Sequence, residues 1–205
     1  MGFYGDHILP RLIDKSLSKP EVDVVRKETL ARAGGVVLEV GLGSGLNLPH
    51  YPRSVTRLLA VEPSLLARKI AARRIAQVPF PVEWIGTDGQ SLSLQDQTVD
   101  QVVSTLTLCT IASPERALKE MVRVLKPGGR LIFLEHGLSD DPGVVRWQKR
   151  LNGLQKTFCG GCQLTRRISE LIESAELKID DLANPRIKGM PKIAHFYRGT
   201  ALKAS

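Results

Sequence analysis

The sequence contains no long hydrophobic run, and none of its apolar stretches approaches the roughly 20 residues that span a bilayer. It also lacks the order of charged, apolar and small residues that marks a secretory signal. Cysteine is scarce, with three in 205 residues, which excludes a disulfide-stapled secreted scaffold. Aromatic residues make up only 5%, and no nucleic-acid recognition motif is present, so nucleic acid is not expected as a partner. Together these absences predict a cytoplasmic protein.

What the chain has in excess is positive charge, with a formal net charge of +8. Basic residues are dense in two stretches, 68–74 and 146–156. A solvated helix face explains such clusters without any partner. The alternative is attraction to anionic head groups, so weak association with an anionic membrane surface stays open. Nothing in the sequence predicts the oligomeric state.

Strand and helix patterns alternate along the chain, which predicts an α/β protein with a mostly parallel, doubly wound sheet. The length fits one domain with its own core. The predicted strands are 36–40, 58–61, 82–85, 99–105, 130–135, 178–183 and 193–203. The predicted helices are 22–33, 64–77, 114–125, 144–157 and 165–175, with a further helix that begins near Leu46 or Pro49.

Alternate glycines follow the first predicted strand: Gly41, Gly43 and Gly45 come directly after it, and Glu39 lies just inside its end. Glycine has no Cβ, so a ligand can approach the backbone closely. Dinucleotide-binding folds usually carry G-x-G-x-x-G, whereas this pattern is E-x-G-x-G-x-G. The carboxylate would repel a pyrophosphate and suits a cationic or amine-bearing ligand. A dinucleotide-dependent oxidoreductase is therefore disfavoured, and an ordinary tight turn remains the alternative for the glycines alone.

A second acid, Glu62, ends the second predicted strand, 21 positions after Gly41. A carboxylate at this distance is placed to accept hydrogen bonds from both hydroxyls of a ribose. Asp88 and Gly89 follow the third strand, and Thr105 and Leu106 end the fourth. Ligands of open α/β sheets bind at these carboxyl ends of the strands.

This constellation resembles motif I and the following segments of the class I S-adenosylmethionine (SAM) methyltransferases. The resemblance implies SAM as the cofactor and a Rossmann-like sheet of seven strands with one antiparallel edge strand. It also implies that Glu62 binds the ribose and that Asp88 contacts the adenine. The cofactor-binding residues expected on this basis are Glu39, Gly41, Gly43, Gly45, Asn47, Glu62, Pro63, Asp88, Gly89, Thr105 and Leu106.

Later segments narrow the resemblance to the group that includes animal thiol S-methyltransferases and bacterial phospholipid or quinone methyltransferases. These segments are 102–111, Phe133-Leu-Glu-His136, Gly161-Cys-Gln-Leu-Thr-Arg166 and the ending with His195 and Tyr197. The group implies one methyltransferase domain over 1–205, with a helical cap (1–33), a SAM-binding core (36–136) and a substrate-side segment with the final strands (137–205). The expected partner is a small-molecule methyl acceptor.

A thiol acceptor needs little help from a base, because nearby positive charge shifts it toward the thiolate. His136, Arg166 and His195 are the residues expected to supply such a field, although His136 could equally be a packing residue. The alternatives are N-methylation of phosphatidylethanolamine, C-methylation of a quinone, or SAM binding without turnover. The expected substrate contacts are Tyr4, His7, Cys109, Cys162 and Tyr197.

Two segments near these residues allow more than one interpretation. Phe3, Tyr4 and His7 could form a lid over the donor or merely pack on the sheet edge. Cys159 and Cys162 form a lone C-x-x-C without a second pair, so no metal is expected and loop geometry or a pocket loop is favoured over redox use.

Overall fold

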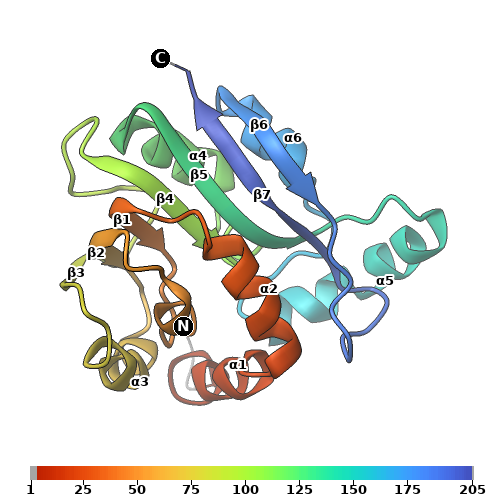
Figure 1. Cartoon of the computed structure of the whole chain (residues 1–205). Coiled ribbons are helices and arrows are strands. Elements are labelled where there is room, and N and C mark those ends of the chain that lie inside the picture. Colours follow the sequence, from red (N-terminus) through yellow and green to blue (C-terminus); the bar gives the residue numbers. More distant parts are fainter. Residues whose placement is uncertain (1–3, 205) are drawn as a thin grey trace.

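The structure, a computed structural model, describes residues 4–204, and in this part seven strands form a single sheet (Figure 1). Their order across the sheet is β3-β2-β1-β4-β5-β7-β6. Strands β1 to β5 are parallel, and β7 is antiparallel to both of its neighbours, β5 and β6. The strands are β1 (Gly35–Val40), β2 (Val55–Val61), β3 (Val82–Gly86), β4 (Val99–Thr105), β5 (Leu125–Gly137), β6 (Leu177–Ala183) and β7 (His195–Lys203).

The predicted α/β class with a mostly parallel, doubly wound sheet is confirmed by this strand order. The antiparallel pair at the sheet edge consists of β7 and the outermost strand β6. Because β6 is antiparallel to β7, it runs in the same direction as β5, so β7 is the one reversed strand.

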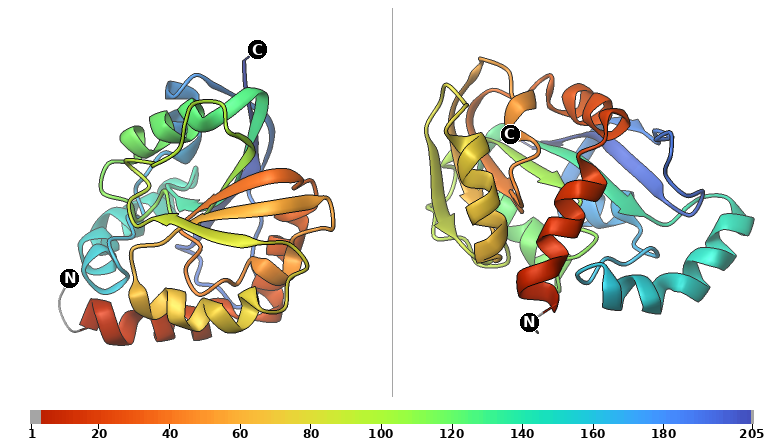
Figure 2. Two further views of the ribbon diagram at one scale, coloured as in Figure 1. Left: turned by 90° about the vertical axis from the view of Figure 1, so that its left-hand side faces the viewer. Right: turned by 90° about the horizontal axis from the view of Figure 1, so that it is seen from below.

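Helices cover both faces of the sheet (Figure 2). They are α1 (Leu9–Leu17) after a π-helical turn η1 (Tyr4–Ile8), α2 (Pro20–Leu30), α3 (Leu65–Ile75), α4 (Pro114–Val124), α5 (Pro142–Phe158) and α6 (Ile168–Ser174). Alternate residues of β1 point to opposite layers, since Leu38 packs with α4 and α6 whereas Val37 packs with α2 and α3. Each face thus buries its own apolar cluster.

One predicted helix is wrong. In place of a helix from Leu46 or Pro49, the structure has a single 3₁₀ turn, η2 (Leu48–His50). Proline at position 49 is compatible with a first helical turn, but Pro52 follows at once and disfavours helical backbone at Tyr51. Tyr51 is accordingly extended, with φ −68° and ψ 130°.

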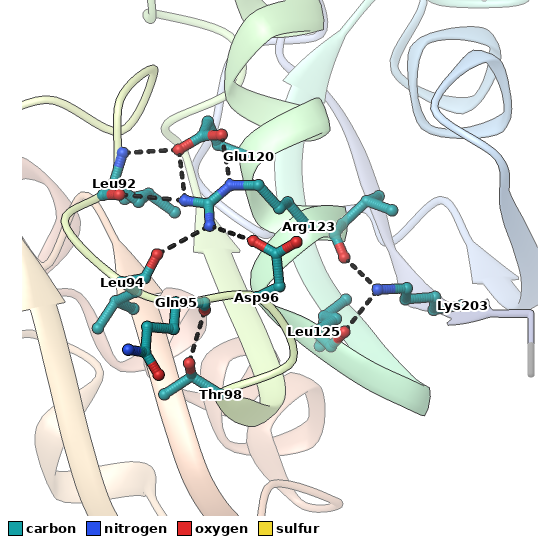
Figure 3. Close-up of polar contacts among 10 residues, drawn as sticks. Leu92, Leu94, Gln95, Asp96, Thr98, Glu120, Arg123, Leu125 and Lys203 are labelled. Atoms are coloured by element: carbon teal, nitrogen blue, oxygen red, sulfur yellow. Dashed lines mark hydrogen bonds and ion pairs between the residues drawn. The ribbon is translucent and has the colours of Figure 1, made fainter.

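The connection from β3 to β4 is fastened to α4 by Arg123 (Figure 3). Its guanidinium donates to the carbonyls of Leu92 and Leu94 at 3.1 and 2.8 Å, and it pairs with Asp96 and Glu120. Glu120 in turn accepts the amide of Leu92 at 2.8 Å. A twelve-residue loop between strands is thereby held close to the body of the protein, and the start of this loop carries Asp88.

Candidate active site

The carboxyl ends of the neighbouring strands β1 and β2 meet at Glu62. Its two carboxylate oxygens accept the amides of Gly43 and Ser64, both at 2.8 Å. Burial raises the pKa of Glu62, and these amide hydrogen bonds oppose the shift. The acid thus faces the glycine loop, and each oxygen keeps further lone pairs for a ligand hydroxyl.

Two of the three glycines serve different purposes in this loop. A Cβ on Gly41 would lie 2.1 Å from the Thr107 hydroxyl, and the backbone φ of 81° is also one that other residues avoid. Gly43, with φ 58°, would place its Cβ no closer than 3.9 Å to any atom. Gly41 is therefore required by packing against the loop after β4, whereas Gly43 borders open space in which a ligand can approach the backbone.

Glu39 lies at the centre of a buried polar network and is 1% exposed. Its oxygens accept Asn47 Nδ2 at 2.7 Å and the Tyr51 hydroxyl at 2.8 Å. Asn47 also donates to Thr105 Oγ1 at 2.9 Å and accepts from Arg26 at 2.7 Å. Both carboxylate oxygens are thus engaged by protein groups, and the network joins the ends of β1 and β4 to α2.

Burial raises the pKa of Glu39 to about 7, although hydrogen bonds from Tyr51 and Asn47 oppose the shift. The folded protein therefore binds this proton more tightly than the unfolded chain, so stability falls as pH rises from 4.5 to 7. We expect the difference in unfolding free energy between wild type and Glu39→Gln to shrink by about 3 kcal/mol over this window. Urea titrations at pH 4.5, 6 and 8 measure this difference. Glu21→Gln, which changes an exposed carboxylate, is the control and should show no such pH dependence. A difference that stays constant with pH would contradict the assignment.

Asp88 and Gly89 lie directly after β3. Asp88 is exposed, and its Oδ1 accepts the backbone amide and side-chain Nε2 of Gln90 at 2.8 and 3.0 Å. The hydrogen bond from the Gln90 side chain holds the pKa of Asp88 below its usual range. Gly89 packs against Val40, where a Cβ would lie 2.5 Å from the valine Cγ1. Pro63 is exposed between Glu62 and Ser64, which caps α3.

The loop after β4 turns sharply at Leu106, whose φ of 54° is uncommon for a residue other than glycine. Glu135, fully buried at the end of β5, holds this loop. Its carboxylate accepts the Ser104 hydroxyl at 2.7 Å and the amides of Thr107, Leu108 and Cys109 at 3.0 to 3.1 Å. These four donors occupy the carboxylate, so Glu135 organises the loop and is not placed as a general base.

Arg166 fastens the same loop from the other side. Its guanidinium donates to the carbonyl of Leu108 and, at 2.7 Å, to that of Ile111. The nearby Gln163 amide donates to the carbonyl of Cys109 at 2.9 Å. Arg166 is 9% exposed, and burial lowers its pKa. The structure thus places this arginine against backbone carbonyls, where it positions the loop.

His136 is buried at the end of β5 beside two cysteines. Its Nδ1 lies 3.5 Å from Cys162 Sγ, which in turn lies 3.7 Å from Cys109 Sγ. The ring packs on Phe196 with centroids 5.4 Å apart. Among the described residues, His136 Nε2 is one of three buried side-chain nitrogens without a hydrogen-bond partner. This ring nitrogen is therefore enclosed by the protein without a hydrogen bond from it.

His195 and Tyr197 lie on β7, and their rings contact each other edge to face with centroids 5.0 Å apart. His195 Nε2 is 3.1 Å from the Asn184 amide nitrogen, and burial lowers the pKa of His195. The Tyr197 hydroxyl donates to the carbonyl of Leu138. β7 pairs with β5 so that His195 is opposite Gly137, one position beyond His136.

The N-terminal helices bridge two sides of the site. The Tyr4 hydroxyl donates to the carbonyl of Phe158 at the end of α5 at 3.0 Å. Arg74 of α3 pairs with Asp14 of α1 at 2.9 Å and donates to the carbonyl of Ser44 in the glycine loop at 2.8 Å. His7 is exposed in η1. Phe3 lies outside the described residues, and a lid role for this segment stays a prediction.

Sequence patterns gave no role to three residues of this site: Arg26, Tyr51 and Glu135, the last of which was predicted only to face the pocket beside His136 at the end of the fifth strand. A signal for Arg26 exists, because it falls within the buried stripe of α2 that contains Val22, Val25 and Thr29. A charge at such a position predicts a buried partner. The roles of Tyr51 and Glu135 depend on contacts between distant segments, which the local pattern does not encode.

Comparison with known proteins agrees with this geometry. A family described as "Methyltransferase domain" matches residues 38–133. Thiol S-methyltransferase TMT1B of Rattus norvegicus is 35% identical over 82% of this chain and 70% of its own length. Phosphatidylethanolamine N-methyltransferase of Cereibacter sphaeroides is 32% identical over 65% of this chain and 68% of its own length.

Among solved structures, a methyltransferase in complex with the Haloferax volcanii Trm112 activator superposes with a TM-score of 0.75. It is 16% identical, over 98% of this chain and 96% of its own, and so shows the fold alone. The chain spans 63 to 74% of the length of four matching thiol S-methyltransferases. By its sequence relatives, the chain belongs to the SAM-dependent methyltransferases.

Proposed function

We propose that this enzyme transfers the methyl group of SAM to the sulfur of a small thiol. The proposal rests on the polar groups at the end of β5. The Glu135 carboxylate is fully hydrogen-bonded to protein donors and so is not placed as a base, whereas the ring nitrogen His136 Nε2 has no hydrogen-bond partner. An amine that arrives protonated needs a base, whereas a thiol of ordinary pKa needs only a favourable field. The identity to thiol S-methyltransferases supports the same acceptor.

The residues at the ends of β1 to β3 fit the donor. The uncrowded backbone at Gly43 provides room for a ligand, and the adjoining carboxylate of Glu62 suits the ribose hydroxyls. Asp88 is exposed and accepts through one oxygen only, so its other oxygen suits the adenine amine. The network of Glu39, Asn47 and Thr105 would position the glycine loop and β4. When bound, SAM supplies a methyl group on a sulfonium, which a nucleophile attacks in line.

The chain's own part in such a displacement is alignment and exclusion of water. His136 Nε2 would hydrogen-bond the acceptor sulfur and hold it in line with the methyl group. Phe196 packs on the imidazole and belongs to an apolar cluster with Leu134 and Ile187, which favours an apolar body on the acceptor. Arg166 would act as a positioning residue through Leu108 and Ile111.

A panel of acceptors tests the proposal. Purified protein is incubated with SAM and, in separate reactions, an alkyl thiol, vesicles containing phosphatidylethanolamine, and a demethylated quinol. We expect a thioether and an equal amount of S-adenosylhomocysteine from the thiol alone. Methylation of the amine or the quinone carbon without thioether overturns the thiol assignment. SAM binding in calorimetry without product from any acceptor would instead support the non-catalytic alternative.

We further propose that one surface of the enzyme binds anionic membranes weakly. The described residues contain no helix long and apolar enough to cross a bilayer. Helix α5 carries four exposed basic side chains and no acidic residue, and Trp147, Leu154 and Phe158 are more than half exposed along it. At its start a depression of about 580 Å³ is lined by Arg146, Trp147, Arg150 and Lys192, among others. Charge and apolar exposure together suit lipid head groups.

Vesicle sedimentation checks this surface. We expect binding to vesicles that contain phosphatidylserine, weaker binding at higher salt, and none to neutral phosphatidylcholine vesicles. Changing Arg146 and Arg150 together to Gln should weaken binding by about 2 kcal/mol, or roughly 30-fold. Lys119→Gln on α4, an exposed basic residue distant from α5 in Figure 1, is the matched control. Equal binding to both vesicle types would contradict the proposal. The cytoplasmic location stays a prediction.

A further inference from the structure

Two cysteines that lie 53 residues apart in the sequence meet beside His136. The Sγ atoms of Cys109 and Cys162 are 3.7 Å apart, and Cys162 Sγ is 3.5 Å from His136 Nδ1. Cys162 also closes the C-x-x-C segment with Cys159, yet its sulfur contact in the structure is Cys109. All three cysteines are free thiols. The tertiary fold, and not the local motif, therefore selects the neighbouring sulfur.

The two sulfurs differ in their affinity for a proton. The hydrogen bond with Cys109 and the nearby His136 lower the pKa of the Cys162 thiol, although burial opposes this. The hydrogen bond with Cys162 and burial raise the pKa of Cys109. The contact between the two sulfurs and the neighbouring His136 thus favour loss of the proton from Cys162 over loss from Cys109, which suits Cys162 as the attacking sulfur in thiol–disulfide chemistry. The described residues contain no group of three His, Cys, Asp or Glu side chains that could hold a metal ion.

We propose that Cys162 and Cys109 form a peroxide-reactive site that closes reversibly into a disulfide. In the first step the Cys162 thiol gives up its proton, its sulfur attacks a peroxide oxygen, an S–O bond forms and the O–O bond breaks, and the leaving hydroxide takes up a proton to become water. In the second step Cys109 loses its proton, its sulfur attacks Cys162 Sγ, and the S–O bond breaks with release of water. One hydrogen peroxide and two thiols thus give one disulfide and two waters.

A disulfide between Cys109 and Cys162 would join two separate segments of the chain. Cys109 lies in the loop that Glu135 and Arg166 hold, and Cys162 lies in the glycine-rich segment that covers it. A Cβ on Gly161 would be 3.0 Å from the carbonyl of Thr110, so the two segments already touch. A disulfide of about 2.05 Å would draw the sulfurs together and lock this contact covalently. We expect slower amide exchange in residues 107–111 and 160–166 after oxidation, with full recovery on reduction.

Peptide mapping of the full chain tests the site without any methyl acceptor. Reduced protein is exposed to hydrogen peroxide, its remaining free thiols are alkylated, and the protein is digested. The Cys109–Cys162 cross-link should appear after oxidation and disappear with dithiothreitol. Cys159→Ser should leave the cross-link unchanged. Cys109→Ala should stop at a sulfenic acid on Cys162 that dimedone labels. In the wild type, Cys162 should react at least about tenfold faster than Cys159.

Two outcomes would overturn the proposal. One is a Cys159–Cys162 disulfide as the main product. The other is oxidation of Cys162 no faster than that of Cys159, which is the more accessible of the two. Both are read from the wild-type protein, so they do not depend on whether a cysteine variant folds.

Discussion

Replacing Glu62 by alanine should weaken SAM binding about 100-fold. In the proposed site this carboxylate accepts two charge-assisted hydrogen bonds from ribose hydroxyls, each worth roughly 1.5–3 kcal/mol. A loss of about 3 kcal/mol corresponds to a factor of about 100 in the dissociation constant. Glu62→Gln keeps one acceptor oxygen and should lose roughly tenfold. Isothermal calorimetry with SAM and with S-adenosylhomocysteine measures both.

The structure also supplies the control for this prediction. Glu62 accepts the amides of Gly43 and Ser64, so its removal also loosens the glycine loop. Thermal unfolding in the absence of ligand separates that effect from lost ligand contacts. Glu83→Gln changes an exposed carboxylate on β3 that pairs with Arg57 and should bind SAM normally. Wild-type affinity in Glu62→Ala would remove Glu62 from the donor site.

Replacing Glu135 should cost more stability than any other single carboxylate change in the site. Four donors converge on this fully buried side chain: the Ser104 hydroxyl and the amides of Thr107, Leu108 and Cys109. Glu135→Leu leaves buried donors unsatisfied and should lower the unfolding free energy by about 4 kcal/mol. Glu135→Gln presents an amide donor to some of the same groups and should lose about 3 kcal/mol.

Thermal and urea unfolding measure these losses, which correspond to roughly 2–4 °C in Tm for each kcal/mol in a chain of this size. Glu170→Gln, which breaks an exposed ion pair with Arg167, serves as the matched control and should change stability by less than about 1 kcal/mol. A Tm of Glu135→Gln within one degree or so of wild type would contradict the role of Glu135 as organiser of the loop.

Features encoded over short distances in the sequence predicted much of the fold. The periods of apolar residues located the strands, and the strand-end position predicted Glu62 as a ribose contact, which stays a prediction. The prediction of a helix after the glycine loop was wrong. Pro52 disfavours helical backbone at Tyr51, so the chain forms only a 3₁₀ turn there.

The surroundings of His136 were predictable only in part, because its contacts join distant segments. His136 was identified from its place at a strand end, but its neighbour Cys162 comes from a loop 26 residues later. The C-x-x-C pattern drew attention to Cys159, whereas the fold brings Cys109 to Cys162. Arg166 was predicted to supply positive charge beside the acceptor, and in the structure its guanidinium donates to the carbonyls of Leu108 and Ile111.

In the proposed reaction the acceptor attacks as a thiolate that is activated by its surroundings and not by a dedicated carboxylate base. The decisive measurement is the pH dependence of kcat/KM for two alkyl thiols of different pKa. If the thiolate is the species that reacts, the midpoint of the rise should follow the pKa of each acceptor and shift between the two thiols. A midpoint that is identical for both thiols, or the absence of thioether product from either, would contradict the account.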